Sequence, residues 1–354
     1  MNINPPRSYS RIPVKLLQME RKQWMWGIYA LLLLAALAAV SLLSLGVGEI
    51  PIPVKDLPRI LSEKESMEYG VLAYIRIPRT LLGLGIGGSL SLAGAILQGI
   101  YRNPLVEPYT LGISGGASLG ITFAIVGGLH LLNILFLPLA GFVGAFATIF
   151  LVYTLSLGKG GLNVNRMLLI GVMISFISSS LMMFLMSITS ADNIHGIVFW
   201  MMGSLNETNS TLIGAMVALS LFCLAVSYLF VMPLNALRLG EEKARHLGFN
   251  ANNVIRILFI LPSLLTGACI AVGGVIGFVG LVVPHIVRLW VGTDYRILLV
   301  SSFLSGGIFL IVCDVIARTI ISPNELPIGV ITGIAGGVAF ILLLTKTKLT
   351  NQRN

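Results

Sequence analysis

Ten apolar segments of about twenty residues each, separated by short polar stretches, constrain this chain more than any other feature. A helix rises about 1.5 Å per residue, so a run of this length matches the roughly 30 Å hydrocarbon core of a bilayer. Hydrophobic residues make up 56% of the chain and charged residues 10%, whereas soluble domains carry about 25% charged residues. The sequence therefore predicts an all-α membrane protein with about ten transmembrane helices.

The expected helices form one polytopic transmembrane domain, residues 24–345, between an N-terminal tail (1–23) and a C-terminal tail (346–354). A secretory signal peptide is the alternative reading of the N-terminus, but the first apolar run is too long and lacks a small-residue cleavage site. Two polar stretches are long enough to have structure of their own, an outer loop at 47–79 and an inner loop at 233–253. The ten helices are predicted at residues 24–46, 80–101, 109–128, 132–157, 166–188, 211–232, 254–273, 275–291, 297–320 and 327–345.

The basic residues fall unevenly on the two sides of this arrangement. If the N-terminus lies inside, six of the 23 Lys and Arg lie outside and the other seventeen inside. This is the positive-inside bias of membrane proteins, and an even number of spans then places both termini in the cytoplasm. Topology thus accounts for the net charge of +9, and nucleic-acid binding is not needed to explain it. The six outer residues are Lys55, Arg59, Lys64, Arg76, Arg79 and Arg318.

Two sites are joined by the second apolar segment. Arg76 and Arg79 come directly before it, and Asn103-Pro104-Leu105 follows its end. Pro104 lacks a backbone donor and stops the helix. Because the segment spans the bilayer, the arginines and the Asn-Pro stretch lie on opposite faces, which suits a docking surface on one side and a gate on the other.

The inner loop contains signals for a short helix. Gly240 separates it from a preceding helical turn, and Gly248 is placed to cap its end. Glu241 and Glu242 fall in the first turn and Arg245 near the last, an order that complements the helix dipole. We therefore expect a small, charged helix on the cytoplasmic side.

Glycines crowd the second and third apolar segments, which favours close helix packing. In the same region, Gln98 is interpreted as a hydrogen-bond partner of a neighbouring helix rather than as a substrate ligand.

Several chemistries are disfavoured by what the sequence lacks. Residues 158–161 (GKGG) have neither the spacing nor the hydroxyl residue of a phosphate-binding loop, so the chain is not expected to bind ATP. The histidines and cysteines are scattered, which predicts no metal site, and no catalytic constellation supports a membrane enzyme. A proton-coupled transporter uses ionisable groups deep in the membrane, but here only Glu107 and Asp314 lie even near helix ends. An ion-coupled secondary transporter with uncharged sites stays open as the alternative.

Taken together, eight short stretches of the sequence resemble the permease subunits of ABC importers for iron–siderophore complexes, haem and vitamin B12, which have the type II importer fold. Each match is weak alone, but they run in order across residues 25–345. The resemblance implies ten helices, a dimeric membrane core with an identical or similar second permease, two cytoplasmic ATPase subunits, an outer substrate-binding protein and a place in the bacterial inner membrane. The matching ranges are 76–80, 94–98, 103–108, 111–117, 200–204, 239–248, 277–288 and 325–330.

The resemblance also implies residue roles. Arg76, Arg79 and Arg318 match arginines that receive carboxylates from the binding protein, and guanidinium groups suit such pairing. Residues 103–105 match the cytoplasmic gate, and the segment from Gly240 to Gly248 matches the coupling helices that enter a groove of the ATPase. The chain itself is expected to be non-catalytic and without a cofactor, with ATP and Mg²⁺ held by the partner ATPase.

These expectations lead to one functional hypothesis. The chain is predicted to be the permease of an ATP-driven importer of a metal chelate, with a ferric siderophore as the first choice of cargo and haem or cobalamin as alternatives. The sequence does not decide which chelate is carried or whether the second permease is identical.

Overall fold

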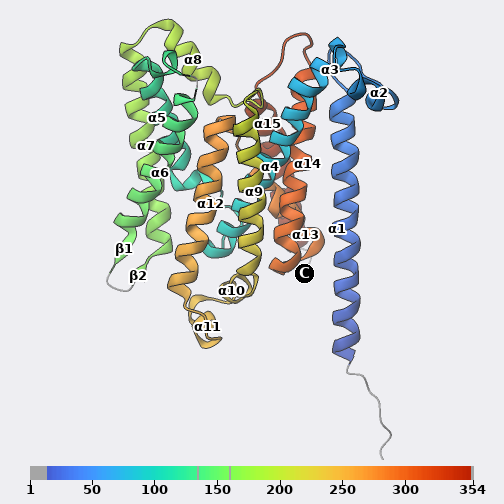
Figure 1. Cartoon of the computed structure of the whole chain (residues 1–354). Coiled ribbons are helices and arrows are strands. Elements are labelled where there is room, and N and C mark those ends of the chain that lie inside the picture. The colour runs from blue at the N-terminus through green and yellow to red at the C-terminus, as the bar shows by residue number, and fades with distance from the viewer. Residues whose placement is uncertain (1–13, 134, 159–160, 352–354) are drawn as a thin grey trace, which may run out of the picture.

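The computed structural model describes residues 14–133, 135–158 and 161–351, and within them it is helical apart from one short β-hairpin (Figure 1). Seven of the described helices are long and apolar enough to cross a membrane, and three shorter apolar helices accompany them. These ten helices are α1 (Val14–Gly46), α4 (Ile77–Tyr101), α5 (Ile113–Val126), α6 (Phe136–Ser156), α7 (Val164–Ile188), α9 (Ser210–Leu229), α12 (Ala251–Gly273), α13 (Val279–Val291), α14 (Tyr295–Thr319) and α15 (Ile328–Asn351).

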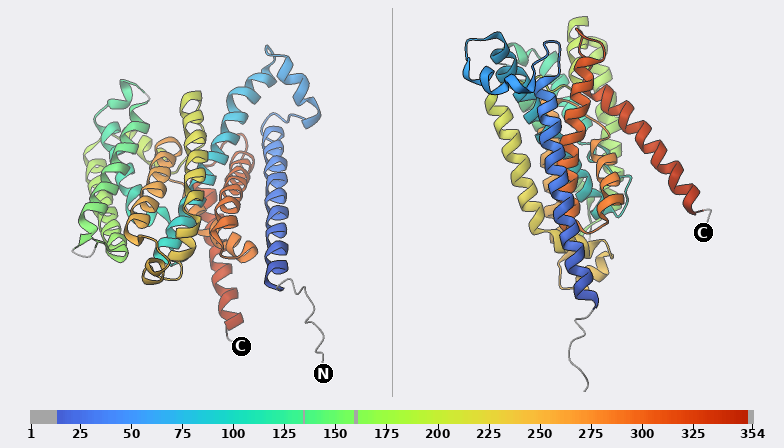
Figure 2. Two further views of the ribbon diagram at one scale, coloured as in Figure 1. Left: turned by 60° about the horizontal axis from the view of Figure 1, so that its bottom comes forward. Right: turned by 90° about the vertical axis from the view of Figure 1, so that its right-hand side faces the viewer.

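Most of the shorter elements lie at the two ends of the bundle, whereas η3 packs inside it (Figure 1). The end that carries α2, α3 and α8 is called the α2 end, and the opposite one, with α10, α11 and the hairpin, is called the α11 end. Helix α1 begins and α15 ends toward the α11 end (Figures 1 and 2). The short elements are η1 (Val54–Asp56), α2 (Leu57–Ser62), α3 (Met67–Val71), η2 (Leu72–Arg76), η3 (Pro108–Leu111), η4 (Leu129–Leu131), β1 (Leu157–Gly158), β2 (Gly161–Leu162), α8 (Ala191–Met201), α10 (Val231–Leu237) and α11 (Glu241–His246).

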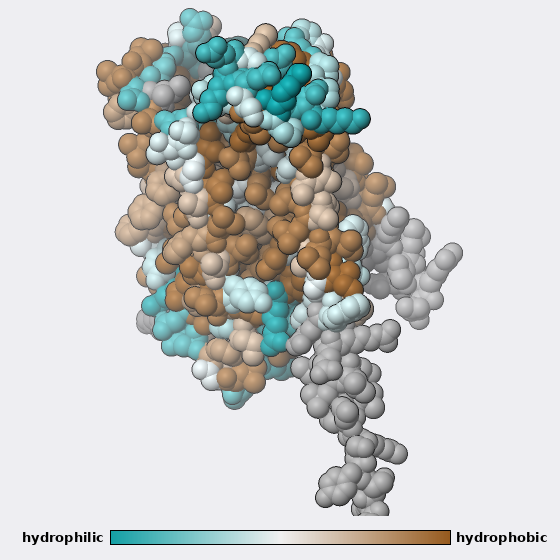
Figure 3. Space-filling model, turned by 45° about the vertical axis from the view of Figure 1, so that its right-hand side comes forward, coloured by the Kyte–Doolittle hydropathy of each residue, from teal (hydrophilic) through white to brown (hydrophobic). Residues whose placement is uncertain are grey.

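A broad hydrophobic band crosses the face of the molecule drawn in Figure 3, between two more hydrophilic ends. Large apolar side chains are more than half exposed on four of the long helices, as at Leu31 in α1, Phe146 in α6, Phe176 in α7 and Phe222 in α9. Exposed apolar side chains in this number are stable only where lipid replaces water. The band is therefore the membrane-facing surface.

Helix α4 occupies the centre of the main bundle, where it contacts α9, α12, α13 and α14. Its glycines explain this position. A Cβ atom on Gly87 would collide with the backbone of Gly306 in α14, and one on Gly94 would collide with the backbone of Gly280 in α13. Because small residues let helix backbones approach closely, α4 packs at two crossings that larger residues would prevent.

Two groups of helices lie at the edges of this core. Helices α5, α6 and α7 contact one another and join the core mainly through α12, while α1 covers the outer side of α14. Helix α15 packs on α13 and α14 and then diverges from the bundle, as the right-hand view of Figure 2 shows.

The ten predicted helices are all present, but several boundaries differ. The segment predicted at 109–128 begins at Ile113, because Pro108–Leu111 forms a 3-10 turn that ends at Gly112 with a φ of 82°. The segment predicted at 275–291 begins at Val279, after Phe278 in a left-handed conformation.

The predicted polar stretches are also more helical than expected. The outer loop 47–79 is helical from Met67 onward and runs directly into α4. Helix α1 starts at Val14, within the predicted tail 1–23, whose first thirteen residues lie outside the described part, and α15 reaches Asn351, within the predicted tail 346–354. Helix α8 was not predicted at all.

Candidate functional site

Arg76 connects the end of α1 and the turn after it to the start of α4 through hydrogen bonds. It is the last residue of η2, and only 3% of its surface is exposed. Its guanidinium donates hydrogen bonds to the backbone carbonyls of Leu45 (2.6 Å), Gly46 (3.2 Å) and Ile50. Leu45 and Gly46 are the last two residues of α1 and Ile50 lies in the turn after it, so one side chain satisfies acceptors that the helix end leaves open.

Arg79 and Arg318 share a buried carboxylate, that of Asp314, at the same end. Nε and Nη2 of Arg79 lie 3.1 and 2.9 Å from Asp314 Oδ1, and Arg318 Nε lies 3.4 Å from Asp314 Oδ2. Arg79 Nη1 also pairs with Glu325 at 2.7 Å, and Arg318 Nη2 donates to both oxygens of Ser44 at 2.8 Å. We call these five residues the arginine cluster. It connects α1, α4, α14 and the segment before α15.

The structure does not present the three predicted docking arginines to a partner. Arg79 and Arg318 are each 7% exposed, and like Arg76 they are hydrogen-bonded inside the chain. A carboxylate arriving from outside would have to displace an internal partner. All three residues lie at the α2 end of the bundle, and in this conformation each guanidinium group is already paired within the described part of the chain.

Most of the exposed charged residues of the α2 end lie in the segment that carries α2 and α3. Lys55, Arg59, Glu63, Lys64 and Glu65 are exposed there, and we call this segment the hydrophilic cap; Figure 3 shows hydrophilic surface at this end. Four buried apolar residues anchor this cap: Ile52, Leu57, Ile60 and Leu72.

The predicted gate lies at the other end of α4. Arg102 adopts a left-handed conformation that ends the helix, and Asn103 Oδ1 accepts a hydrogen bond from the Leu105 backbone N–H at 2.9 Å. Asn103, Pro104 and Leu105 are all exposed, whereas Val106 is buried. The stretch is thus a tight, solvent-facing turn held at both sides, as the proline predicted.

Glu107, which follows this turn, is partly buried between α4 and η3. Burial raises the pKa of its carboxyl group above the ordinary value, and a hydrogen bond from the Phe278 backbone N–H offsets part of the rise.

The inner-loop helix has the predicted form. Helix α11 covers Glu241–His246, with acidic residues in its first turn and basic residues in its last. Gly240 (φ 113°) and Gly248 (φ 86°) bracket it in conformations that favour glycine. Arg245 lies 3.7 Å from Glu241, one turn away on the same face. Helix α11 lies at the very end of the bundle (Figure 1).

A pocket of about 360 Å³ opens beside the gate and is rich in positive charge. Arg288 Nη2 donates to Gln98 Oε1 at 3.0 Å, and Gln98 Nε2 donates to the Gly280 and Leu281 carbonyls. Gln98 is therefore an interhelical hydrogen-bond partner, as predicted. Sequence reasoning missed this pocket, because its residues come from four separate segments: Gln98, Arg102, Pro104, Arg238, His285, Arg288, Leu289, Thr293 and Tyr295.

A second polar cavity, of about 470 Å³, lies at the opposite end beside α8. Asp192, Asn193 and Glu207 line it together with the aromatic rings of Phe199 and Trp200. Within the described part of the chain, no three His, Cys, Asp or Glu side chains gather where they could hold a metal ion.

An apolar helical bundle whose described polar pockets lie at its two ends defines the class of this molecule, a multi-pass membrane protein. A model of the FecCD transport family matches residues 34–346, and the chain belongs to that family. It is an ABC transporter permease of the inner membrane, in the group whose members serve metal chelates, haem and vitamin B12.

Two curated relatives and one solved structure illustrate the similarity. The hemin transport system permease protein HmuU of Yersinia pestis is 38% identical over 77% of this chain and 83% of its own. The vitamin B12 import system permease protein BtuC of Klebsiella pneumoniae is 36% identical over 94% and 96%. A metal-chelate type ABC transporter solved in an inward-facing conformation superposes with a TM-score of 0.80 and 28% identity, covering 91% of this chain and 99% of that one.

Proposed function

We propose that this chain is the non-catalytic permease subunit of an ATP-driven importer, through which a metal chelate passes from an outer binding protein into the cytoplasm. ATP and Mg²⁺ bind to a partner ATPase in this scheme. The α11 segment is the observation that carries the proposal, because it offers a surface to a partner where the bundle ends.

The exposed side chains of this segment support that role. Ala244 is buried against the bundle and fixes α11 in place, while Leu239 and Leu247 on either side of it are 56% and 59% exposed. Large apolar residues among charged ones at a water-facing end are typical of a protein interface. Glu241, Glu242 and Arg245 would give that interface its specificity. The α11 end is then cytoplasmic, with the positive-inside bias in support.

The arginine cluster limits how the outer arginines could bind a partner, because Arg79 is already paired within the chain. Glu325 is 41% exposed on its side chain while its carboxylate pairs with Arg79. A carboxylate of the binding protein would reach Arg79 by replacing Glu325. Because one carboxylate replaces another, Arg79 keeps an ion pair, and the exchange costs less than leaving its buried charge unpaired. In this scheme docking and the position of the segment before α15 are coupled.

The gate function of Asn103, Pro104 and Leu105 is supported by their position. They form an exposed turn beside the basic pocket and face the same end as α11. Movement of α11 by the ATPase would reach this turn through Arg102, whose Nη1 lies 3.6 Å from the place where a Cβ atom would stand on Gly240.

Our first choice of cargo is a ferric siderophore, within the metal-chelate class of the family. The named relatives for hemin and vitamin B12 favour haem and cobalamin as the specific alternatives. Competition between a ferric siderophore, haemin and cyanocobalamin for uptake by the assembled transporter would distinguish them, since only the true cargo should block uptake of its own labelled form.

Co-purification tests the proposal directly. Affinity-purified permease from its native host should carry an ATPase subunit in stoichiometric amount, and Leu239→Glu together with Leu247→Glu should remove it while the permease still folds. A permease that purifies without an ATPase and still transports its cargo in an ion gradient would instead support the secondary-transporter alternative.

A further inference from the structure

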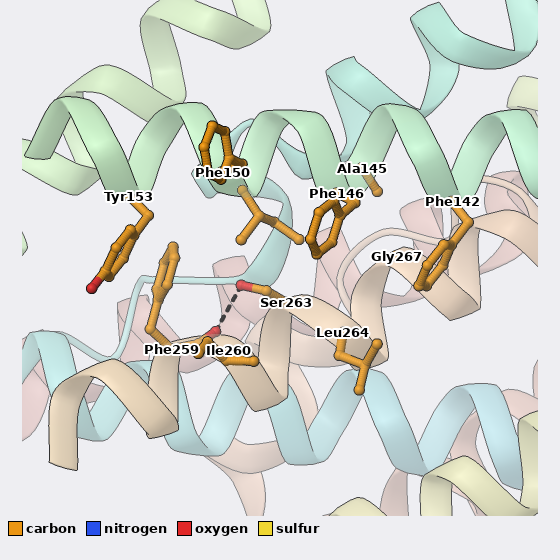
Figure 4. Close-up of a pocket in the computed structure, with 11 residues that line it drawn as sticks. Phe142, Ala145, Phe146, Phe150, Tyr153, Phe259, Ile260, Ser263, Leu264 and Gly267 are labelled. Carbon is orange, nitrogen blue, oxygen red and sulfur yellow. Dashed lines mark hydrogen bonds between the residues drawn. The ribbon is translucent and has the colours of Figure 1, made fainter. Parts of the chain in front are cut away.

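A groove on the membrane-facing surface between α6 and α12 belongs to neither end of the transport path. It encloses about 220 Å³ (Figure 4). One wall consists of aromatic side chains of α6, namely Phe142, Phe146, Phe150 and Tyr153. Their spacing of three to four residues places all four on one face of the helix. The groove therefore runs along α6 for the length of these four residues.

The floor of the groove offers nothing to a polar ligand. A Cβ atom on Gly267 would stand 3.2 Å from the Ala145 side chain, so the two helices nearly touch there. The hydroxyl of Ser263 donates to the Phe259 carbonyl of its own helix at 2.7 Å, as the dashed line in Figure 4 shows. With that hydrogen bond made, the Tyr153 hydroxyl is the one remaining polar side-chain group of the lining, which therefore suits a hydrocarbon chain.

The length of the groove agrees with one leaflet of a bilayer. From Phe142 to Tyr153 the helix rises about 16 Å, and half of the hydrocarbon core measures about 15 Å. Tyr153 lies three residues before the end of α6 at the α11 end. Its ring therefore stands near the membrane–water boundary, where tyrosine is enriched.

A basic residue, Arg256, lies toward the same end of the groove. Arg256 precedes Ile260 and Ser263 by four and seven residues, which places it on the groove-facing side of α12, one turn closer to the α11 end. Its Nε atom is buried without a hydrogen-bond partner, and no ion pair to Arg256 forms within the described residues. The residue as a whole is partly exposed, so an anionic oxygen from outside the chain can pair with its guanidinium group.

We propose that this groove binds an anionic phospholipid, with one acyl chain along the aromatic wall of α6 and the phosphate on Arg256. The groove would hold the acyl chain, and Arg256, one helical turn beyond Ile260 toward the α11 end, would pair with the headgroup. The site does not depend on the nature of the cargo or on the ATPase.

Native mass spectrometry of the detergent-purified permease, with added phosphatidylglycerol or phosphatidylcholine, tests the proposal. Wild-type protein should retain phosphatidylglycerol more strongly, by about fivefold, the preference expected for one basic group at an anionic headgroup. Arg256→Gln should abolish the preference. Arg166→Gln, which removes an exposed arginine of α7 near the same interface but outside the groove, should leave it unchanged.

A second variant tests the acyl-chain part. Phe146→Ala with Phe150→Ala removes two side chains that are each more than half exposed, so folding should survive, and retention of both lipids should fall. Equal retention of both lipids by the wild type, or a preference that survives Arg256→Gln, would overturn the proposal. Efficient disulfide cross-linking between two chains through Phe146→Cys would overturn it as well, because a second copy would then cover the groove.

Discussion

At the scale of single residues, the arginine cluster shows how a charge can lie at a membrane boundary without facing water. Asp314 is 1% exposed, accepts hydrogen bonds from Arg79 and forms an ion pair with Arg318, so its negative charge is compensated where solvent does not reach it. Removing one partner of such a buried pair costs more than the pair contributes, because the remaining charge is left uncompensated. The cluster is therefore a structural element first, and any docking role must operate through it.

Arg79→Ala should destabilise the permease by about 3 to 5 kcal/mol, the usual cost of breaking a buried pair. The loss leaves Asp314 with one arginine and Glu325 with none. Thermal unfolding in detergent measures the effect. Arg59→Ala is the matched control, since its ion pair with Glu63 is exposed and 3.9 Å long and should contribute at most about 1 kcal/mol. Similar shifts for the two variants would show that the buried pairing does not hold the fold together.

At the scale of elements, α11 depends on one backbone conformation. Gly240 has a φ of 113° and a ψ of 152°, a region that is essentially limited to glycine. A Cβ atom there would meet no atom closer than 3.6 Å, so the penalty of a side chain comes from the backbone and not from a collision. The orientation of α11 thus rests on this residue.

Gly240→Ala should cost about 1 to 3 kcal/mol locally and turn α11 away from its position. We expect ATP-driven transport and cargo-stimulated ATPase activity of the assembled complex to fall severalfold while the melting of the bundle changes little. Gly214→Ala in α9 is the control, because its Cβ atom would meet nothing within 4 Å and its backbone is helical. If the Gly240→Ala variant transports at the wild-type rate, the position of α11 is not needed to couple ATP hydrolysis to transport.

The elements also show what the sequence could predict. Helix α11 was predicted because its glycines, acids and bases are local signals, and α4 because its apolar run is uninterrupted. Helix α8 was missed although Ser190 caps it by accepting from Asn193, since a short helix at the surface has no long apolar run. The burial of Arg79 could not be foreseen, because its partners lie 235 and 246 residues away in the sequence.

At the scale of the whole molecule, the distribution of carboxylates bears on the source of energy. Of the ten apolar segments predicted from the sequence, only the one at 297–320 contains an acidic residue, Asp314. That carboxylate is already paired with Arg79 and Arg318. A proton-coupled carrier needs an intramembrane group that gains and loses a proton during the cycle, and a doubly paired Asp314 is poorly suited to that task.

The permease reconstituted alone in liposomes should therefore accumulate no chelate against a gradient, whether a proton or a sodium gradient is imposed. Adding the ATPase, the binding protein and ATP should produce uptake, because nucleotide-dependent closure of the ATPase then supplies the free-energy difference between the two states of the gate. Labelled chelate inside the vesicles is the measurement, and vesicles with a non-hydrolysable nucleotide are the control. Concentrative uptake by the permease alone would mean that uncharged groups within the bundle bind a coupling ion, and the importer mechanism would have to be abandoned.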